Sequence, residues 1–188
     1  MSETAVSPSA ADAASPSQQR SLAQQLANRS ITVVANDRES TGGVRHEDRY
    51  LPLRSKRVYV AGPAAAGLTA ALRPELAATG GRIVASPAQA DAIVAATRDA
   101  VGDAAQRRLV RELVASGRPV LVLATGLPYD LGLFRGMRAG VASYSGSGVS
   151  LSAAAAVLTG RLPPLGRLPV AIPAAGGPAF GYGTGLSY

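Results

Sequence analysis

The chain has 188 residues and no cysteine, which suits one domain with a buried core and excludes disulfide and thiolate chemistry. Its net charge of +7 comes from scattered arginines without interleaved aromatic residues to stack on bases, so we expect no nucleic-acid partner. No apolar run reaches the ~20 residues of a membrane span, so we expect no membrane partner either. Because the first residues carry no secretory signal, we expect a cytoplasmic chain as it stands, or a secreted one if it is a fragment of a longer exported enzyme.

The first 56 residues are expected to form a tail and a linker. Residues 1–20 lack apolar periodicity and are rich in Ser, Ala and Pro, which is typical of a disordered tail. The linker, 21–56, begins with a short predicted helix from an N-cap at Ser21 to about Asn28. The β-branched segment 30–34 then predicts a strand.

The polar segment 36–50 is expected to be a long exposed loop within this linker. It carries His46, the only histidine of the chain, which is flanked by an arginine and two acidic residues. With no second histidine and no cysteine, His46 lacks the partners of a metal site, and a solvated charged loop is the simpler interpretation. We expect no metal site and no cofactor.

From residue 57 onward, short apolar strands alternate with amphipathic helices. Asp103 and Ser150 are the expected N-caps of the last two helices. Strands are expected at 58–61, 82–85, 92–96, 120–123 and 140–143, and helices around 68–76, 103–116 and 150–158. This alternation predicts an α/β fold: a three-layer α/β/α sandwich over 57–188 with a mostly parallel sheet of five to six strands.

The turn 62–67, Gly-Pro-Ala-Ala-Ala-Gly, follows a strand and opens a helix, as a phosphate-binding loop does. Leu68 and Thr69 follow it, where such a loop carries a lysine and then Ser or Thr. We interpret the segment as an ordinary strand-to-helix turn without a nucleotide.

Four motifs follow one another in the last third of the chain. They read Pro-Tyr-Asp-Leu at 128–131, Ala-Ser-Tyr-Ser at 142–145, Gly-Arg-Leu-Pro-Val-Ala-Ile-Pro at 166–173 and Phe-Gly-Tyr-Gly-Thr-Gly-Leu-Ser-Tyr at 180–188. In this order they resemble the C-terminal domain of family 3 glycoside hydrolases, most closely the bacterial β-N-acetylhexosaminidase (β-N-acetylglucosaminidase) branch. That family keeps its catalytic nucleophile in a separate (β/α)8 barrel, for which 188 residues leave no room beside this domain. The resemblance implies no catalytic residue in this chain and a catalytic (β/α)8 barrel domain or subunit as its partner.

The loop after the strand 92–96 holds the candidate substrate-binding residues. In the β-glucosidase branch of the resembled family this loop supplies the acid/base glutamate, whereas residues 97–103 read Thr-Arg-Asp-Ala-Val-Gly-Asp. This form resembles the hexosaminidase branch instead. Arg98 and Asp99 are expected at the carboxyl end of a parallel strand, where α/β sheets expose ligands, so we name them as candidate contacts to a carbohydrate ligand. An exposed ion pair is the alternative.

Side chains in the motifs have two interpretations each. Asp130 either caps the short turn 131–134, which is the favoured interpretation, or faces the barrel together with Tyr129. Three tyrosines could offer rings to a sugar, but we expect them to pack the C-terminal segment onto the sheet: Tyr144, Tyr182 and Tyr188.

We therefore predict the C-terminal domain of a family 3 β-N-acetylhexosaminidase-like hydrolase, inactive without the catalytic barrel. The alternative is a non-catalytic carbohydrate-binding or interaction module with the same fold, which would bind sugar without any barrel. The surface for a partner domain is expected at the carboxyl ends of the parallel strands, where the loops are rich in small residues: 62–67, 97–102, 125–130 and 145–149.

Overall fold

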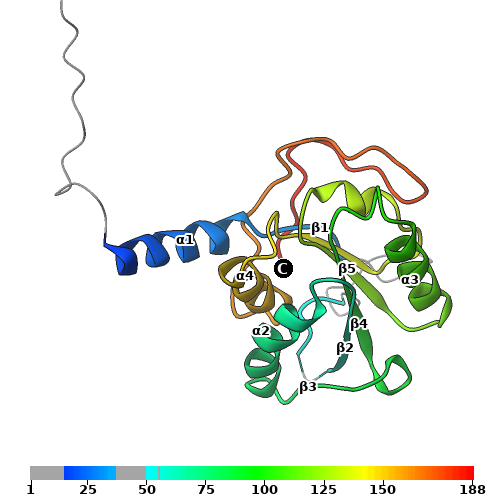
Figure 1. Ribbon diagram of the computed structural model, residues 1–188, viewed down its shortest axis with the longest axis horizontal. Helices are drawn as coiled ribbons and strands as arrows, with labels where there is room; N and C mark the ends of the chain where they lie inside the picture. Colours follow the sequence, from blue (N-terminus) through cyan, green and yellow to red (C-terminus); the bar gives the residue numbers. More distant parts are fainter. Residues whose placement is uncertain (1–14, 37–49, 55) are drawn as a thin grey trace, which may run out of the picture.

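The computed structural model describes residues 15–36, 50–54 and 56–188 (Figure 1). The predictions made for residues 1–14 and for the loop 37–49, including His46, lie outside the described residues. The described part forms a six-stranded sheet with helices on both faces.

The sheet has the order β1-β6-β5-β4-β2-β3, in which β1 runs antiparallel to β6 and every other neighbouring pair is parallel. The strands are β1 (Thr32–Asn36), β2 (Arg57–Ala61), β3 (Arg82–Ile83), β4 (Ala92–Thr97), β5 (Val120–Ala124) and β6 (Ala139–Ala142). The helices are α1 (Pro16–Ser30), α2 (Ala65–Ala77), α3 (Ala104–Ala115) and α4 (Gly148–Leu158), with the 3₁₀ turns η3 (Pro87–Gln89) and η4 (Pro128–Gly132). This confirms the predicted three-layer α/β fold with a mostly parallel sheet.

Helices α2 and α4 cover one face of the sheet (Figure 1). The three leucines of α2 that recur every four residues, Leu68, Leu72 and Leu76, are fully buried, as their spacing predicted. Small residues let the two helices approach closely, because a Cβ at Gly67 of α2 would lie 2.8 Å from Cδ1 of Leu151 in α4. Helix α1 packs against α4 and otherwise extends away from the body.

Helix α3 and the turn η4 cover the opposite face. Val110 and Leu113 of α3 are buried there in a cluster with Leu131 of η4. Between the two layers lie β4 and β5, in which every residue is buried. The apolar run of β5 is thus enclosed on both faces, which is typical of a parallel strand at the centre of a sheet.

Two helices begin at residues other than those predicted. Helix α1 begins at Pro16 because Ser15 forms a capping box: its side chain accepts from the Gln18 amide, and the Gln18 side chain accepts from the Ser15 amide. Helix α4 is capped by Ser147, whose hydroxyl accepts from the Ser150 amide, so Ser150 lies inside the helix. In both cases a serine three residues upstream of a helical polar residue supplied the stronger cap.

The C-terminal segment runs without a helix along the outer edge of β1. The amide of Gly166 donates to the Ile31 carbonyl, and that of Leu186 donates to the Val33 carbonyl. These bonds cover an edge strand that would otherwise expose unpaired backbone groups. We call residues 168–188 the C-terminal arm; backbone bonds between Ile172 and Phe180 fold it back on itself.

Candidate functional site

Four loops meet at one edge of the sheet, where β2, β4, β5 and β6 end. Because these strands are parallel, their carboxyl ends share this edge, which we call the strand-end edge. Arg98 and Asp99 directly follow β4, an inner strand, and both side chains are exposed. The structure therefore places this pair at the position that the sequence predicted.

The main chain of Arg98 is held by the side chain of Gln106 in α3. Gln106 Oε1 accepts from the Arg98 amide at 3.0 Å, and its Nε2 donates to the Arg98 carbonyl at 2.7 Å. Gln106 is itself fixed by Asp103, the predicted N-cap of α3, whose Oδ2 accepts from Nε2 at 3.0 Å. The start of the helix thus clamps the loop that precedes it.

The rest of this loop is held from two sides. Arg107 Nη1 donates to the carbonyls of Ala100 and Val101, the first at 2.8 Å. From the other side, Asp130 Oδ1 accepts from the Ala100 amide at 2.8 Å. We call residues 98–102 the clamped loop, since side chains from α3 and η4 together fix its backbone.

Asp130 has a different role from the predicted cap of the turn 131–134. Its side chain is 1% exposed and reaches across to the clamped loop instead. Burial raises the pKa of Asp130 above its usual value, and the amide bond from Ala100 opposes this rise. Asp130 Oδ2 and the nearby buried Thr97 Oγ1 have no hydrogen-bond partner among the described residues, and buried polar atoms without a partner are rare in proteins.

Asp99 has a left-handed backbone, with φ of 53°. Few residues other than glycine adopt this conformation, although aspartate does so more readily than most. A backbone of this kind persists where the surroundings over-determine it, and such residues cluster at functional sites. The clamps on both sides of Asp99 provide that support.

The side chains of Arg98 and Asp99 extend toward different loops. The carboxylate of Asp99 lies beside Gly126, where a Cβ would come within 2.7 Å of its Oδ1. The guanidinium of Arg98 lies over Gly146, where a Cβ would come within 3.2 Å of its Nη2. Two glycines therefore make room for the two charged groups, one in the loop after β5 and one in the loop after β6.

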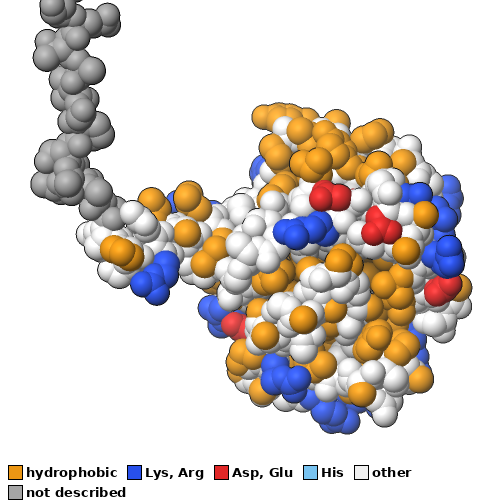
Figure 2. Space-filling model, in the orientation of Figure 1, with side chains coloured by type: hydrophobic (Ala, Val, Ile, Leu, Met, Phe, Trp, Pro, Cys, Tyr) orange, Lys and Arg blue, Asp and Glu red, His pale blue; other side chains and the backbone are white. Residues whose placement is uncertain are grey.

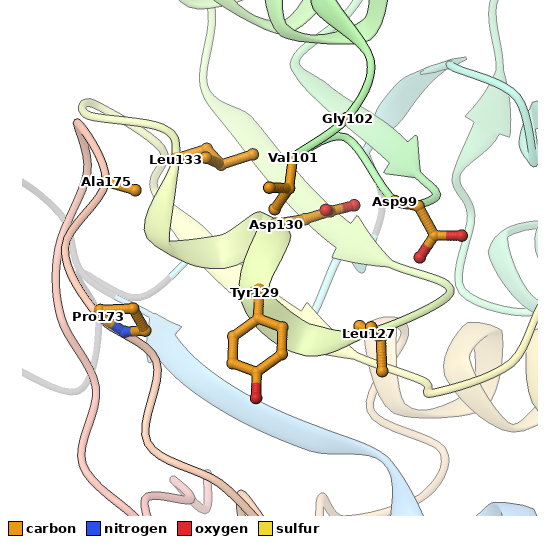
Figure 3. Close-up of a pocket in the computed structure, with 9 residues that line it drawn as sticks. All are labelled: Asp99, Val101, Gly102, Leu127, Tyr129, Asp130, Leu133, Pro173 and Ala175. Carbon is orange, nitrogen blue, oxygen red and sulfur yellow. The ribbon is translucent and has the colours of Figure 1, made fainter.

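A pocket flanks the clamped loop on each side. The larger, about 440 Å³, lies on the Asp99 side (Figure 3) and is lined by Asp99, Val101, Gly102, Leu127, Tyr129, Asp130, Leu133, Pro173 and Ala175. The smaller, about 210 Å³, lies on the Arg98 side and is lined by Pro63, Ala64, Gly67, Arg98, Gly146 and Leu151. The larger pocket falls in the size range of small-ligand sites, and most of its lining is apolar.

The tyrosines divide between packing and exposure. Tyr188 donates to the Val157 carbonyl of α4 and packs against the core on that face, so it holds the end of the chain in place as expected. Tyr144 instead shares a 2.8 Å hydrogen bond with Thr32 of β1, which joins the end of β6 to β1 and does not involve the C-terminal segment. Tyr182 is 79% exposed, so the prediction that it packs onto the sheet was wrong. Tyr129 is 36% exposed at the rim of the larger pocket.

Two further properties bear on what the site can do. Within residues 15–36, 50–54 and 56–188, no group of three His, Cys, Asp or Glu side chains is arranged to hold a metal ion. In the same part of the chain, no helix has both the length and the apolar character needed to cross a membrane.

Fold and site together define a three-layer α/β domain that presents a rigid, charged loop at its strand-end edge. Residues 44–188 match the model of the glycosyl hydrolase family 3 C-terminal domain, and the chain belongs to this family. No curated protein matches the sequence.

Solved structures of several glycosidases share the fold. The chain is similar to a β-N-acetylglucosaminidase from Paenibacillus sp., with 18% identity and a TM-score of 0.61 over 94% of this chain and 36% of that one. It is also similar to a β-glucosidase from Erythrobacter marinus, with 18% identity and a TM-score of 0.69 over 93% of this chain and 35% of that one. A fungal multi-domain β-N-acetylglucosaminidase gives 21% identity and a TM-score of 0.63 over 85% of this chain and 20% of that one. The chain thus spans between a fifth and about a third of the length of these structures, and the fold does not separate the two kinds of enzyme.

Proposed function

We propose that this chain is the C-terminal domain of a family 3 glycoside hydrolase of the β-N-acetylhexosaminidase branch. It acts together with a catalytic (β/α)8 barrel, in the same polypeptide or in another one, and does not hydrolyse glycosides by itself. The sequence of the clamped loop supports this branch, because it contains Arg98 and Asp99 but no glutamate that could act as a general acid.

The observation that carries the proposal is the rigid presentation of Arg98 and Asp99. A sugar contact requires polar groups that are fixed before the ligand arrives, so that little entropy is lost on binding. The clamped loop meets this requirement, because Gln106, Arg107 and Asp130 hold its backbone while the two charged groups remain exposed. In the proposed role, Asp99 accepts hydrogen bonds from sugar hydroxyls and Arg98 donates to sugar oxygens.

Turnover of an aryl N-acetyl-β-glucosaminide tests this proposal. The chain alone should give none, whereas the chain mixed with the separately expressed catalytic region of the Paenibacillus enzyme should exceed that region alone. Asp99→Asn should then lower kcat/KM of the mixture by about 10-fold or more, the effect of losing a charged hydrogen bond of roughly 1.5–3 kcal/mol. Asparagine suits this test because it also adopts a left-handed backbone. Turnover by the chain alone, abolished in the Asp99→Asn variant, would refute the non-catalytic role.

A second candidate, a sugar-binding module without a barrel, is favoured by one observation. The exposed ring of Tyr129 and the carboxylate of Asp99 line the same pocket (Figure 3), and an aromatic ring beside a carboxylate is a combination that suits a sugar. Binding of N-acetylglucosamine oligosaccharides to the chain alone, measured by calorimetry and lost in Tyr129→Ala, would favour this candidate over the first.

A further inference from the structure

The layer of the molecule that contains α3 is rich in positive charge. Between residues 104 and 138 the sequence has six arginines and two acids, and one of these acids, Asp130, is buried. This stretch forms α3, β5, η4 and the loop before β6, so most of its arginines lie on one face of the sheet although they are scattered in the sequence. In Figure 2, Lys and Arg side chains gather along the right side of the molecule, where Figure 1 places α3.

Three arginines of α3 share the side of the helix that faces water. Arg111 follows Arg108 by three residues and Arg107 by four, and residues with these spacings are neighbours on a helix surface. Arg108 and Arg111 are exposed and Arg107 is half-buried. Their exposed neighbours on this side are the small residues Ala104 and Ala115, so no bulky apolar side chain interrupts the row.

A fourth arginine reaches α3 from the loop after η4. Gly136 packs against the helix, because a Cβ there would lie 3.0 Å from Cγ1 of Val114. Val114 follows Arg111 by three residues, so Arg135, the exposed neighbour of Gly136, begins beside the same row. We call Arg107, Arg108, Arg111 and Arg135 the arginine face.

The charges of the arginine face are poorly offset by acids. Within the part of the chain that the structure describes, no salt bridge joins Arg108, Arg111 or Arg135 to a carboxylate. Arg107 donates to two carbonyls of the clamped loop, which carry no net charge. The guanidinium groups therefore remain available to an anionic partner, and each can bind a carboxylate through two parallel hydrogen bonds.

The composition of the face favours one kind of anionic partner. A nucleic acid is disfavoured because α3 has no aromatic side chain on which a base could stack. A membrane surface is disfavoured because the exposed side of α3 has no bulky apolar side chain to enter the lipid. An acidic polysaccharide requires neither feature, and the chain belongs to a family of glycosyl hydrolase domains.

We infer that the arginine face binds an acidic polysaccharide, which lies along α3 and places its carboxylates on the guanidinium groups. One end of the face adjoins the clamped loop, since Arg107 holds the carbonyls of Ala100 and Val101. The bound polymer therefore runs close to Arg98 and Asp99. The inference goes beyond the proposed function and does not require a catalytic partner, so the chain alone suffices to test it.

Calorimetric titration of the chain with polygalacturonate tests the inference. The double variant Arg108→Gln, Arg111→Gln removes two charges from the face, and Arg73→Gln, Arg82→Gln removes two exposed charges from α2 and β3 as the matched control. At about 50 mM salt we expect the face variant to bind at least 10-fold more weakly, and its affinity to depend less on salt, because fewer counterions are released. We expect the control to bind within twofold of the unmodified chain and all three proteins to have the same thermal midpoint.

Four results would overturn the inference. The unmodified chain could fail to bind polygalacturonate at about 50 mM salt, or could bind uncharged dextran equally well. The control could weaken binding as much as the face variant does, which would mean that binding follows net charge and is not located on α3. Duplex DNA at the same charge concentration could bind more tightly than polygalacturonate and be lost in the face variant, which would make the partner a nucleic acid.

Discussion

The two halves of the strand-end edge differ in what they offer to a partner. The Asp99 half has a pocket of about 440 Å³, exposed leucine and valine side chains, and a wall supplied by the uncharged arm. The Arg98 half has a pocket of about 210 Å³ that is lined by glycines, small residues and one guanidinium. Both halves belong to the same sheet, so the difference comes from the loops, the arm and the helices α2 and α4 that surround the edge. One sheet edge thus presents two chemically different surfaces, one mostly apolar and one that places a guanidinium among small residues.

The largest expected effect concerns the sheet that supports both halves. Leu121 of β5 is fully buried, so Leu121→Ala should lower the free energy of unfolding by about 2–5 kcal/mol, through lost burial and a new cavity. Leu127→Ala is the matched control, since a substitution at an exposed site usually changes stability by about 0.5 kcal/mol or less. Urea unfolding followed by circular dichroism measures both. A shift too small to detect in Leu121→Ala would mean that β5 does not hold the two halves together.

A smaller effect on the free energy of unfolding should come from Asp130, which lines the pocket of the Asp99 half, and it should depend on pH. Burial raises the pKa of Asp130 in the folded chain, so the folded state binds its proton more tightly than the unfolded state does. This contribution to stability is therefore complete at low pH and is lost as the pH rises from about 4. In Asp130→Asn the group cannot ionise, so the stability of the unmodified chain relative to this variant should fall as the pH rises.

The control for this pH effect is Asp91, an acid whose pKa is shifted in the opposite direction. Asp91 accepts hydrogen bonds from Arg57, which lower its pKa to about 2, so the stability that it contributes is present above pH 4 and is lost toward pH 2. In Asp91→Asn the free energy of unfolding should no longer fall between pH 4 and pH 2 through this group. The difference from the unmodified chain should be small, because the Arg57–Asp91 pair is exposed. Equal slopes for Asp130→Asn and the unmodified chain above pH 4 would contradict a buried ionisable anchor beneath the clamped loop.

The smallest effect on stability should come from a change beside the Asp99 carboxylate. An alanine at position 126 would bring its Cβ within 2.7 Å of Oδ1, and this end of the side chain can rotate away. We expect Gly126→Ala to shift stability by less than about 1 kcal/mol and to displace the carboxylate in a crystal structure. Gly148→Ala is the control, because nothing lies within 4 Å of a Cβ there. An unmoved Asp99 carboxylate would mean that Gly126 does not determine its direction.

Much of the fold could be predicted from local patterns. The four-residue spacing of Leu68, Leu72 and Leu76 and the cap at Asp103 predicted two helices, because these signals depend on neighbours in the sequence. The start of α1 was missed because the Ser-Pro pair at 15 and 16 was assigned to a polar tail, although it carries a capping box.

The site was predictable only in part, because its geometry depends on contacts between distant segments. The position of Arg98 and Asp99 followed from the end of a parallel strand, but their divergence depends on Gly126 and Gly146 in other loops. The hydrogen bond from the Ala100 amide to Asp130 joins residues 30 positions apart, which no local pattern indicates. A local cap was therefore the simpler interpretation of Asp130. The larger pocket was not predicted, since the arm that forms its wall has no helical or strand periodicity.

The most direct test of this account titrates a fixed amount of the Paenibacillus catalytic region with increasing amounts of this chain and records the turnover that the chain adds. The account predicts that the turnover added by the unmodified chain rises to a plateau, because the chain completes the enzyme only when it is bound to the catalytic region. It predicts that Asp99→Asn lowers the plateau kcat/KM and leaves the half-saturating concentration unchanged, because it acts on the sugar. If Asp99→Asn leaves the plateau unchanged, Asp99 does not contact the sugar and the central claim is contradicted.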